Sequence, residues 1–125
     1  MSRPNLDEVA KNGNIESMDN NQKRRYELTA EIFKAMGHPM RLAILEKLKD
    51  RSWCVCELAD DLKLNKSVTS KHLSQLRSAG ILETEKHGTQ VVYTLATPCV
   101  LEMSECSLRA TIEQRNKRMS FEGVQ

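Results

Sequence analysis

Four cysteines form the most chemically specific pattern in the sequence. Cys54 and Cys56 are separated by a single valine, whereas Cys99 and Cys106 lie seven residues apart near the C-terminus. Thiolates are the soft ligands that As(III), Sb(III), Cd(II) and Pb(II) prefer. Side chains two residues apart lie on one face of an extended segment but diverge in a helix. The Cys54/Cys56 pair therefore predicts a site for a thiophilic metal or metalloid ion where the chain is locally extended.

The cysteine pair lies at the predicted start of a short helix, residues 55–62. Cys54 takes the N-cap position, and Glu57 follows three residues later as in a capping box. The positive field at a helix N-terminus favours a thiolate there. Binding one ion through both sulfurs competes with the first turn of this helix. We expect the resulting distortion of the first turn to be transmitted to the helix that follows.

Composition limits the classes of protein that the chain can represent. Its 125 residues are 39% hydrophobic with a formal net charge of +2, which suits one domain and does not by itself indicate nucleic acid. The sequence contains neither an apolar run long enough for a membrane span nor a secretory h-region. We therefore expect a cytoplasmic protein with reduced thiols. A thiol-dependent enzyme is disfavoured, because Cys-x-Cys resembles a redox pair only loosely and no phosphate-binding Gly-rich loop is present.

Hydrophobic spacing and punctuation predict an α+β, mostly helical fold. Helices are expected over residues 24–36, 40–49, 55–62 and 66–79, followed by strands over 81–86 and 90–95 and a last helix over 98–115. Gly37 ends the first helix and His38 is a turn residue before the second. Residues 1–21 and 117–125 are polar and are expected to be a flexible arm and tail. A single domain then spans residues 22–116.

Two helices joined by a tight turn and followed by a hairpin make a winged helix-turn-helix, in the order α-α-α-α-β-β-α. The helix over 66–79 must bury Thr69, Leu73 and Leu76. Its other side then presents short hydroxyls, cations and one apolar side chain that suit phosphates, base edges and a thymine methyl: Lys66, Ser67, Val68, Ser70, Lys71 and His72. His87, at the hairpin tip, is a further candidate for a phosphate contact. An ordinary solvated helix looks similar, but the hairpin that follows favours DNA binding.

Three segments resemble the ArsR/SmtB family of metal-sensing winged-helix repressors. Residues 36–45 are similar to the family's L-x-D/H-P-x-R-L-x-I-L, residues 54–59 to the metalloid-sensing C-V-C-D/E-L, and residues 67–76 to S-x-x-S-x-H-L-x-x-L. The resemblance covers residues 33–95. It departs from the family at Thr69 and Val68, where the apolar and polar residues have exchanged. The last helix also lacks the His/Asp pattern of the zinc-sensing members.

The resemblance implies a homodimer whose first and last helices form the interface, and repression relieved by a ligand. Such a dimer presents two reading helices, so we expect it to bind double-stranded DNA at a two-fold symmetric operator. The predicted inducer is As(III), Sb(III) or another thiophilic ion such as Cd(II) or Pb(II). We expect no organic cofactor, no membrane partner and no enzymatic activity.

The role of the two C-terminal cysteines stays open at the level of sequence. Trigonal As(III) takes three thiolates, and Cys99 or Cys106 is the candidate third ligand, within the subunit or across the dimer. These two are about 10 Å apart along a helix and cannot share an ion within it. They are equally consistent with small hydrophobic residues at the dimer interface. The alternative function is a redox-sensing repressor, in which Cys54 or Cys56 forms a disulfide with one of them.

Overall fold

The computed structural model describes residues 15–122 of the chain. A short 3-10 turn, η1 (Ile15–Ser17), precedes four helices, a hairpin and a last long helix, with one short strand inserted between the second and third of those helices. The predicted winged helix-turn-helix is therefore confirmed. Residues 1–14 of the predicted arm lie outside the described residues, and the rest of that arm contains η1 and the start of α2.

The first two long helices begin at side-chain caps. Helix α2 (Asn20–Met36) begins before the expected Arg24, because the Asp19 carboxylate accepts the backbone N–H of Gln22 at 3.0 Å. Helix α3 (Pro39–Leu48) begins after His38, whose Nδ1 accepts the N–H of Met40 at 3.0 Å. The predicted turn role of His38 is confirmed in this specific form, and Pro39 occupies the first helical position, where its missing N–H costs nothing.

Helices α4 (Val55–Leu62) and α5 (Lys66–Ser78) form the helix-turn-helix. Lys63 ends α4 in the left-handed region, with φ of 55°, and Asn65 caps α5 by accepting the N–H of Val68 at 2.7 Å. The reversal between the two helices is thus only a few residues long. Gly80, with φ of 84°, ends the segment that follows α5, as its lack of a Cβ allows.

The wing is an antiparallel hairpin of β2 (Leu82–His87) and β3 (Gln90–Leu95), with Gly88 at its tip at φ of 66°. A strand that the sequence analysis missed, β1 (Trp53–Cys54), pairs with the other edge of β3 and completes a three-stranded sheet in the order β1-β3-β2. Two residues are too few to show the alternation by which strands are recognised. The strand places Cys54 opposite Val92.

One hydrophobic core joins the helix-turn-helix to the sheet. Its fully buried members come from α3, α4, α5 and the start of the hairpin: Ile44, Leu45, Leu58, Leu73, Leu76 and Ile81. Tyr93 of the wing and the first turn of the last helix close the same core. Helix α5 and the wing are therefore packed on one common core.

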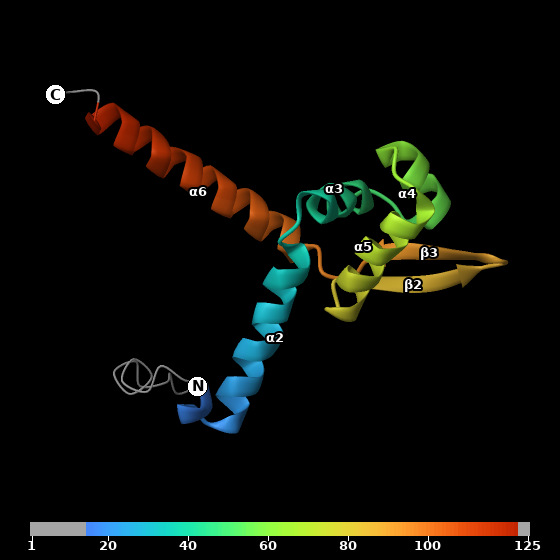
Figure 1. Ribbon diagram of the computed structural model, residues 1–125, viewed down its shortest axis with the longest axis horizontal. Helices are drawn as coiled ribbons and strands as arrows, with labels where there is room; N and C mark the ends of the chain where they lie inside the picture. The colour runs from blue at the N-terminus through green and yellow to red at the C-terminus, as the bar shows by residue number, and fades with distance from the viewer. Residues whose placement is uncertain (1–14, 123–125) are drawn as a thin grey trace.

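The last helix, α6 (Cys99–Glu122), is anchored only at its base, where Val100 and Leu101 are buried. Beyond this turn it projects from the domain, as does α2 (Figure 1). The prediction that the helix ends near Arg115 is wrong, because α6 continues to Glu122. The flexibility expected of the tail from Lys117 stays a prediction, and residues 123–125 lie outside the described residues. Neither proline nor glycine occurs between Arg115 and Gly123, so nothing stops the helix before Glu122.

Candidate nucleic-acid interface and cysteine site

Helix α5 has one buried face and one exposed face, as its sequence predicts. Thr69, Leu73 and Leu76 are buried. Thr69 is tolerated there because its hydroxyl donates to the carbonyl of Asn65 at 2.9 Å, which satisfies the buried polar group. Val68, the apolar residue that stands where the family pattern has a polar one, is exposed. Helix α5 therefore presents its polar residues and one valine to solvent.

Two hollows flank the exposed ridge of α5. The first, a shallow depression of about 610 Å³ toward the start of α4, is lined by four of the predicted DNA contacts, Lys66, Ser67, Ser70 and Lys71, together with Val55 and Ser74. The second, of about 520 Å³, lies toward the start of α3: His38, Arg41, Val68, Lys71, His72, Ser74 and Gln75. The structure thus brings the six predicted contacts on α5 together along one ridge. Ridges of this kind are what a major groove admits.

His72 is half-buried at the edge of this ridge and contacts residues that the sequence analysis did not connect to it. Its Nδ1 accepts a hydrogen bond from Nε of Arg41 at 3.3 Å, and its ring lies 4.6 Å from that of His38. Burial, followed by the nearby His38 and Arg41, lowers the pKa of His72 below its usual 6.5. The lowered pKa and the hydrogen bond that Nδ1 accepts from Arg41 both favour the neutral form of the ring.

Arg41 is the functional candidate that the sequence analysis missed. It follows His38 and Pro39 in the first motif, but the motif gave no reason to place it beside α5. The fold does so, because α3 packs against α5 through the core residues of both helices. The available signal was a cation in the first turn of a helix that precedes a helix-turn-helix.

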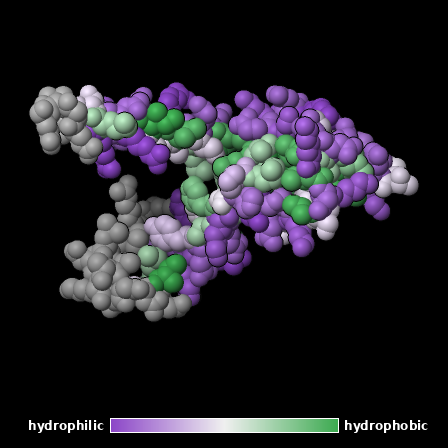
Figure 2. Space-filling view, turned by 45° about the horizontal axis from the view of Figure 1, so that its top comes forward, coloured by the Kyte–Doolittle hydropathy of each residue, from purple (hydrophilic) through white to green (hydrophobic). Residues whose placement is uncertain are grey.

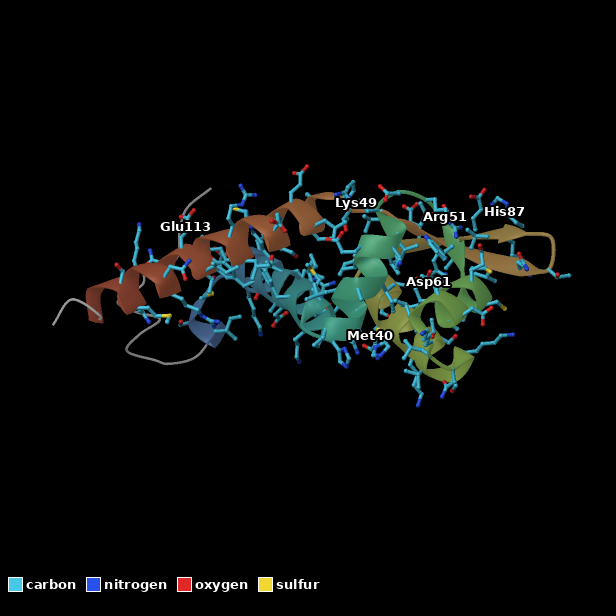
Figure 3. The ribbon with its side chains drawn as sticks, turned by 90° about the horizontal axis from the view of Figure 1, so that it is seen from above. Met40, Lys49, Arg51, Asp61, His87 and Glu113 are labelled. Carbon is cyan, nitrogen blue, oxygen red and sulfur yellow. The ribbon has the colours of Figure 1, made fainter. Side chains whose placement is uncertain are left out.

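The wing candidate, His87, is exposed at the end of β2. Figure 3 shows it toward the hairpin end of the molecule, whereas Met40, near the start of α3, lies toward the middle of the view. Its Nε2 lies 3.4 Å from a carboxylate oxygen of Glu85. His87 and α5 would thus contact DNA at separate points, which is the arrangement of a winged helix.

The cysteine pair has two very different environments. Cys54, the N-cap of α4, is 5% exposed, whereas Cys56, in the first turn, is exposed. The Glu57 carboxylate accepts the backbone N–H of Cys54 at 3.2 Å, and this bond, together with Arg51, holds the pKa of Glu57 below 4.5. One cysteine of the pair is therefore shielded from solvent and the other is accessible, at the start of a formed helix turn.

The surroundings of the pair provide a spectroscopic reporter. Trp53, the only tryptophan of the sequence, precedes Cys54 directly and donates from Nε1 to the carbonyl of Lys47 at 2.9 Å. The guanidinium of Arg51 stacks over its ring at 3.5 Å and also pairs with Glu57. Any opening of the first turn of α4 changes the environment of this indole.

Cys99 and Cys106 are exposed on α6, and helical spacing places them opposite the stripe formed by Leu108 and Ile112. Among residues 15–122, no three His, Cys, Asp or Glu side chains are arranged to hold a metal ion. Helix α6 leaves the domain away from α4 (Figure 1), so Cys99 and Cys106 lie on a different part of the fold from the Cys54/Cys56 pair. Whether one of them is the third ligand, within the subunit or across a dimer, stays a prediction.

The length and composition of the helices bear on the question of a membrane span. Within the described part of the chain, no helix combines the length and apolar character that crossing a bilayer requires.

The sequence is similar to those of known DNA-binding regulators. Residues 38–84 match the family described as "Bacterial regulatory protein, arsR family". The uncharacterized HTH-type transcriptional regulator MJ1325 of Methanocaldococcus jannaschii is 44% identical over 80 residues, which cover 63% of this chain and 90% of that protein. The HTH-type transcriptional repressor SmtB of Mycobacterium tuberculosis is 38% identical over 66 residues, which cover 53% of this chain and 49% of that protein.

A solved structure supports the fold independently. The homodimeric winged helix-turn-helix DNA-binding domain of Mb0332 from Mycobacterium bovis superposes with a TM-score of 0.71 at 22% identity, over 78% of this chain and 93% of that one. At that level of identity the likeness concerns the fold, and it agrees with the element order described above.

Proposed function

This chain belongs to the arsR family of bacterial regulatory proteins, and we propose that it represses transcription by binding duplex DNA and releases DNA when its cysteines react. The family and its relatives make the chain a DNA-binding transcriptional regulator rather than an enzyme. What we propose beyond this is that the regulator represses rather than activates transcription, and which inducer it responds to.

The observation that carries the proposal is the exposed ridge of α5 with the wing beside it. Lysines and serines line this ridge, and the hairpin is fixed to the same core. Lysine reaches phosphates, and serine reaches phosphates or base edges. We assign Lys66, Ser67, Val68, Ser70, Lys71 and His72 to the groove contact and His87 to the wing contact.

We further propose that two copies pair through α2 and α6. Large apolar side chains on both projecting helices are exposed in the single chain, including Leu28 and Phe33 on α2 and Leu108 and Ile112 on α6. Figure 2 shows hydrophobic side chains along projecting α6, away from the domain's own core. A pair of this kind presents two copies of α5 and fits a two-fold symmetric operator.

The inducer site that we propose is the Cys54/Cys56 pair, with As(III), Sb(III), Cd(II) or Pb(II) as the ion. Because Cys54 is buried and Cys56 is exposed, we expect the first turn of α4 to open when one ion binds both sulfurs. Opening breaks the Glu57–Cys54 hydrogen bond and disturbs α4, which packs directly on α5. The reading helix thus loses part of its support when the ion binds.

Competition binding tests the DNA-binding part. Purified protein is titrated with fluorescent mixed-sequence duplex DNA, with heparin and single-stranded DNA as competing polyanions. We expect tighter binding to the duplex and a loss of affinity in Lys71→Ala that is accompanied by a weaker salt dependence. A protein that binds heparin and duplex alike, or whose Lys71→Ala variant matches the wild type, contradicts the assignment.

Release of DNA tests the inducer part. Arsenite, antimonite, Cd(II) and Pb(II) are each added to the protein–duplex complex while Trp53 fluorescence and free thiols are followed. We expect release, a fluorescence change and the loss of two or three thiols, all abolished in Cys54→Ser. Thiol counts in Cys99→Ser and Cys106→Ser identify a third ligand. Unchanged behaviour in Cys54→Ser rejects the site.

The exposure of Cys56, Cys99 and Cys106 favours one second candidate, a thiol redox switch on the same scaffold. Here mild peroxide releases DNA by forming a disulfide. Mass mapping of disulfides after peroxide decides between the two. DNA affinity that survives peroxide, with no disulfide found, rejects the redox switch and leaves the metalloid site as the proposal.

A further inference from the structure

We propose that the hollow between α5 and the start of α3 binds a backbone phosphate of duplex DNA, with Arg41 and His72 as its donors. The inference rests on the DNA-binding function proposed above, because it names a second contact of the same interface. The hollow is lined by four groups with basic side chains, His38, Arg41, Lys71 and His72, and its described lining includes no carboxylate. An anionic ligand is the class that such a lining suits.

Arg41 is held in a fixed direction by the protein itself. Its Nε donates to Nδ1 of His72 at 3.3 Å, and its Nη1 donates to the carbonyl of Ala35 at 3.1 Å. A guanidinium has five N–H donors, of which these two bonds use two. Arg41 lines this hollow and also a neighbouring one that contains Glu31, so its remaining donors are shared between two openings. The two bonds leave the side chain little freedom to lose on binding. This is the condition under which an arginine forms a strong phosphate contact.

The bond from Arg41 also fixes the tautomer of His72. Arginine is always protonated and can only donate, so Nδ1 of His72 must be the acceptor and carries no proton. Neutral His72 therefore carries its proton on Nε2. The Nε2 N–H is then a donor that the bond to Arg41 does not use, on a ring that lines the hollow. Arg41 and His72 thus supply two donors from two different helices.

The position of the hollow explains why its ligand is a phosphate of duplex DNA rather than a base. Lys71 and Ser74 line both hollows, so they form the crest of α5 between them. When this crest enters a major groove, the two hollows face the two sugar–phosphate strands that border the groove. The second hollow then receives one strand. His72, which sequence left between base and phosphate, is assigned to phosphate.

Salt-dependent binding to a mixed-sequence duplex tests the inference without knowledge of an operator. Arg41→Gln removes the charge. Lys49→Gln, its matched control, removes one exposed charge at the opposite end of α3 (Figure 3). We expect Arg41→Gln to weaken binding about tenfold. The slope of log affinity against log salt should also fall by about 1 for each subunit in contact. Lys49→Gln should change neither quantity.

A second pair of variants keeps the test valid even where Arg41→Gln lowers stability through its lost bond to Ala35. His72→Gln retains an N–H donor near the Nε2 position, whereas His72→Leu has none. We expect His72→Leu to weaken binding to mixed-sequence duplex and to duplexes selected by the wild-type protein by the same factor, and His72→Gln to retain most of the affinity. A loss confined to the selected duplexes means base contact and overturns the inference.

Inorganic phosphate separates a duplex contact from a general anion site. NMR signals of the His72 ring are followed during titration with phosphate and, separately, with duplex. We expect the duplex to shift them at concentrations far below those at which phosphate does. Equal responses at equal phosphate concentration overturn the assignment to duplex. If the wild type does not prefer duplex at all, the proposed function fails as well. If the wild type does prefer duplex, but Arg41→Gln and His72→Leu bind it as well as Lys49→Gln does, only this inference fails.

Discussion

At the scale of single residues, the cap of the reading helix is the clearest determinant of its position. The side chain of Asn65 accepts a hydrogen bond from the N–H of Val68. Its backbone carbonyl accepts a second hydrogen bond from the hydroxyl of Thr69. We expect Asn65→Ala to lower the free energy of unfolding by about 1 kcal/mol, because one N–H at the helix start loses its partner. Urea denaturation measures this. Asn65→Asp keeps the acceptor, and an equal loss in that variant would show that the cap is not the cause.

The pKa of His72 makes a second prediction at this scale. His38, Arg41 and Lys71 are the charged or titratable groups that face it, and burial is the largest cause of its lowered pKa. We expect an NMR titration midpoint below 6.5 in the folded protein. We also expect an upward shift in Arg41→Gln that does not restore the ordinary value, since burial remains. A folded midpoint at or above 6.5 contradicts the packing described for this ring.

The same shift sets the sign of a pH effect on stability. Because the folded pKa of His72 lies below the unfolded value, the unfolded chain takes up the proton first as pH falls. The contribution of the neutral ring to stability is thus fully present above pH 6.5 and is lost as pH falls through the folded pKa. His72→Gln removes the titrating group and should flatten this part of the stability profile.

At the scale of elements, the first turn of α4 is the part expected to move. Glu57 ties it by accepting the backbone N–H of Cys54. We expect Glu57→Ala to open this turn more often, so that Cys54 reacts several-fold faster with a neutral thiol reagent. Cys99 is exposed and belongs to a different helix, so its labelling rate provides the control. An unchanged rate at Cys54 would show that Glu57 does not hold the turn closed.

The elements themselves were largely predictable from the sequence, because each one is bounded by a local signal. Gly37, Asn65 and Gly80 mark the ends of helices, and the β-branched run of β3 marks a strand. The exposed face of α5 followed directly from its buried residues. What could not be predicted depends on packing between distant segments: the two-residue strand β1, and the contact of Arg41 with His72 thirty-one positions later.

The ends of the outer helices were also misjudged, for a related reason. α6 continues beyond Ile112 through a mostly polar segment, in which Met119 repeats the apolar position seven residues later. Polar composition suggested a tail, whereas the absence of a helix breaker decided the outcome. The fourteen-residue segment before η1 lies outside the described residues, so its predicted flexibility stays a prediction.

At the scale of the whole molecule, the exposed stripe on α6 makes the dimer testable. Leu108, Ile112 and Met119 are 56%, 46% and 70% exposed and recur at helical spacing. We expect Ile112→Glu to shift the protein from dimer to monomer in analytical ultracentrifugation, because it places a charge in the paired surface. DNA affinity should fall with it, since the two reading helices are no longer linked.

Ala110→Glu is the matched control for that change. It adds the same charge to α6, but helical spacing places it on the opposite side from Ile112. The control should remain dimeric. Dissociation in Ala110→Glu with a stable dimer in Ile112→Glu would place the interface on the other face of α6, together with Cys99 and Cys106.

The central claim is that α5 enters duplex DNA with the wing and the start of α3 on its flanks. NMR shift mapping of the full-length protein with a mixed-sequence duplex tests it most directly. We predict the largest backbone shifts along residues 66–75, with further shifts at His87 and Arg41 and none along the projecting part of α6. Shifts concentrated on α6 or α2, with α5 unaffected, would contradict the account.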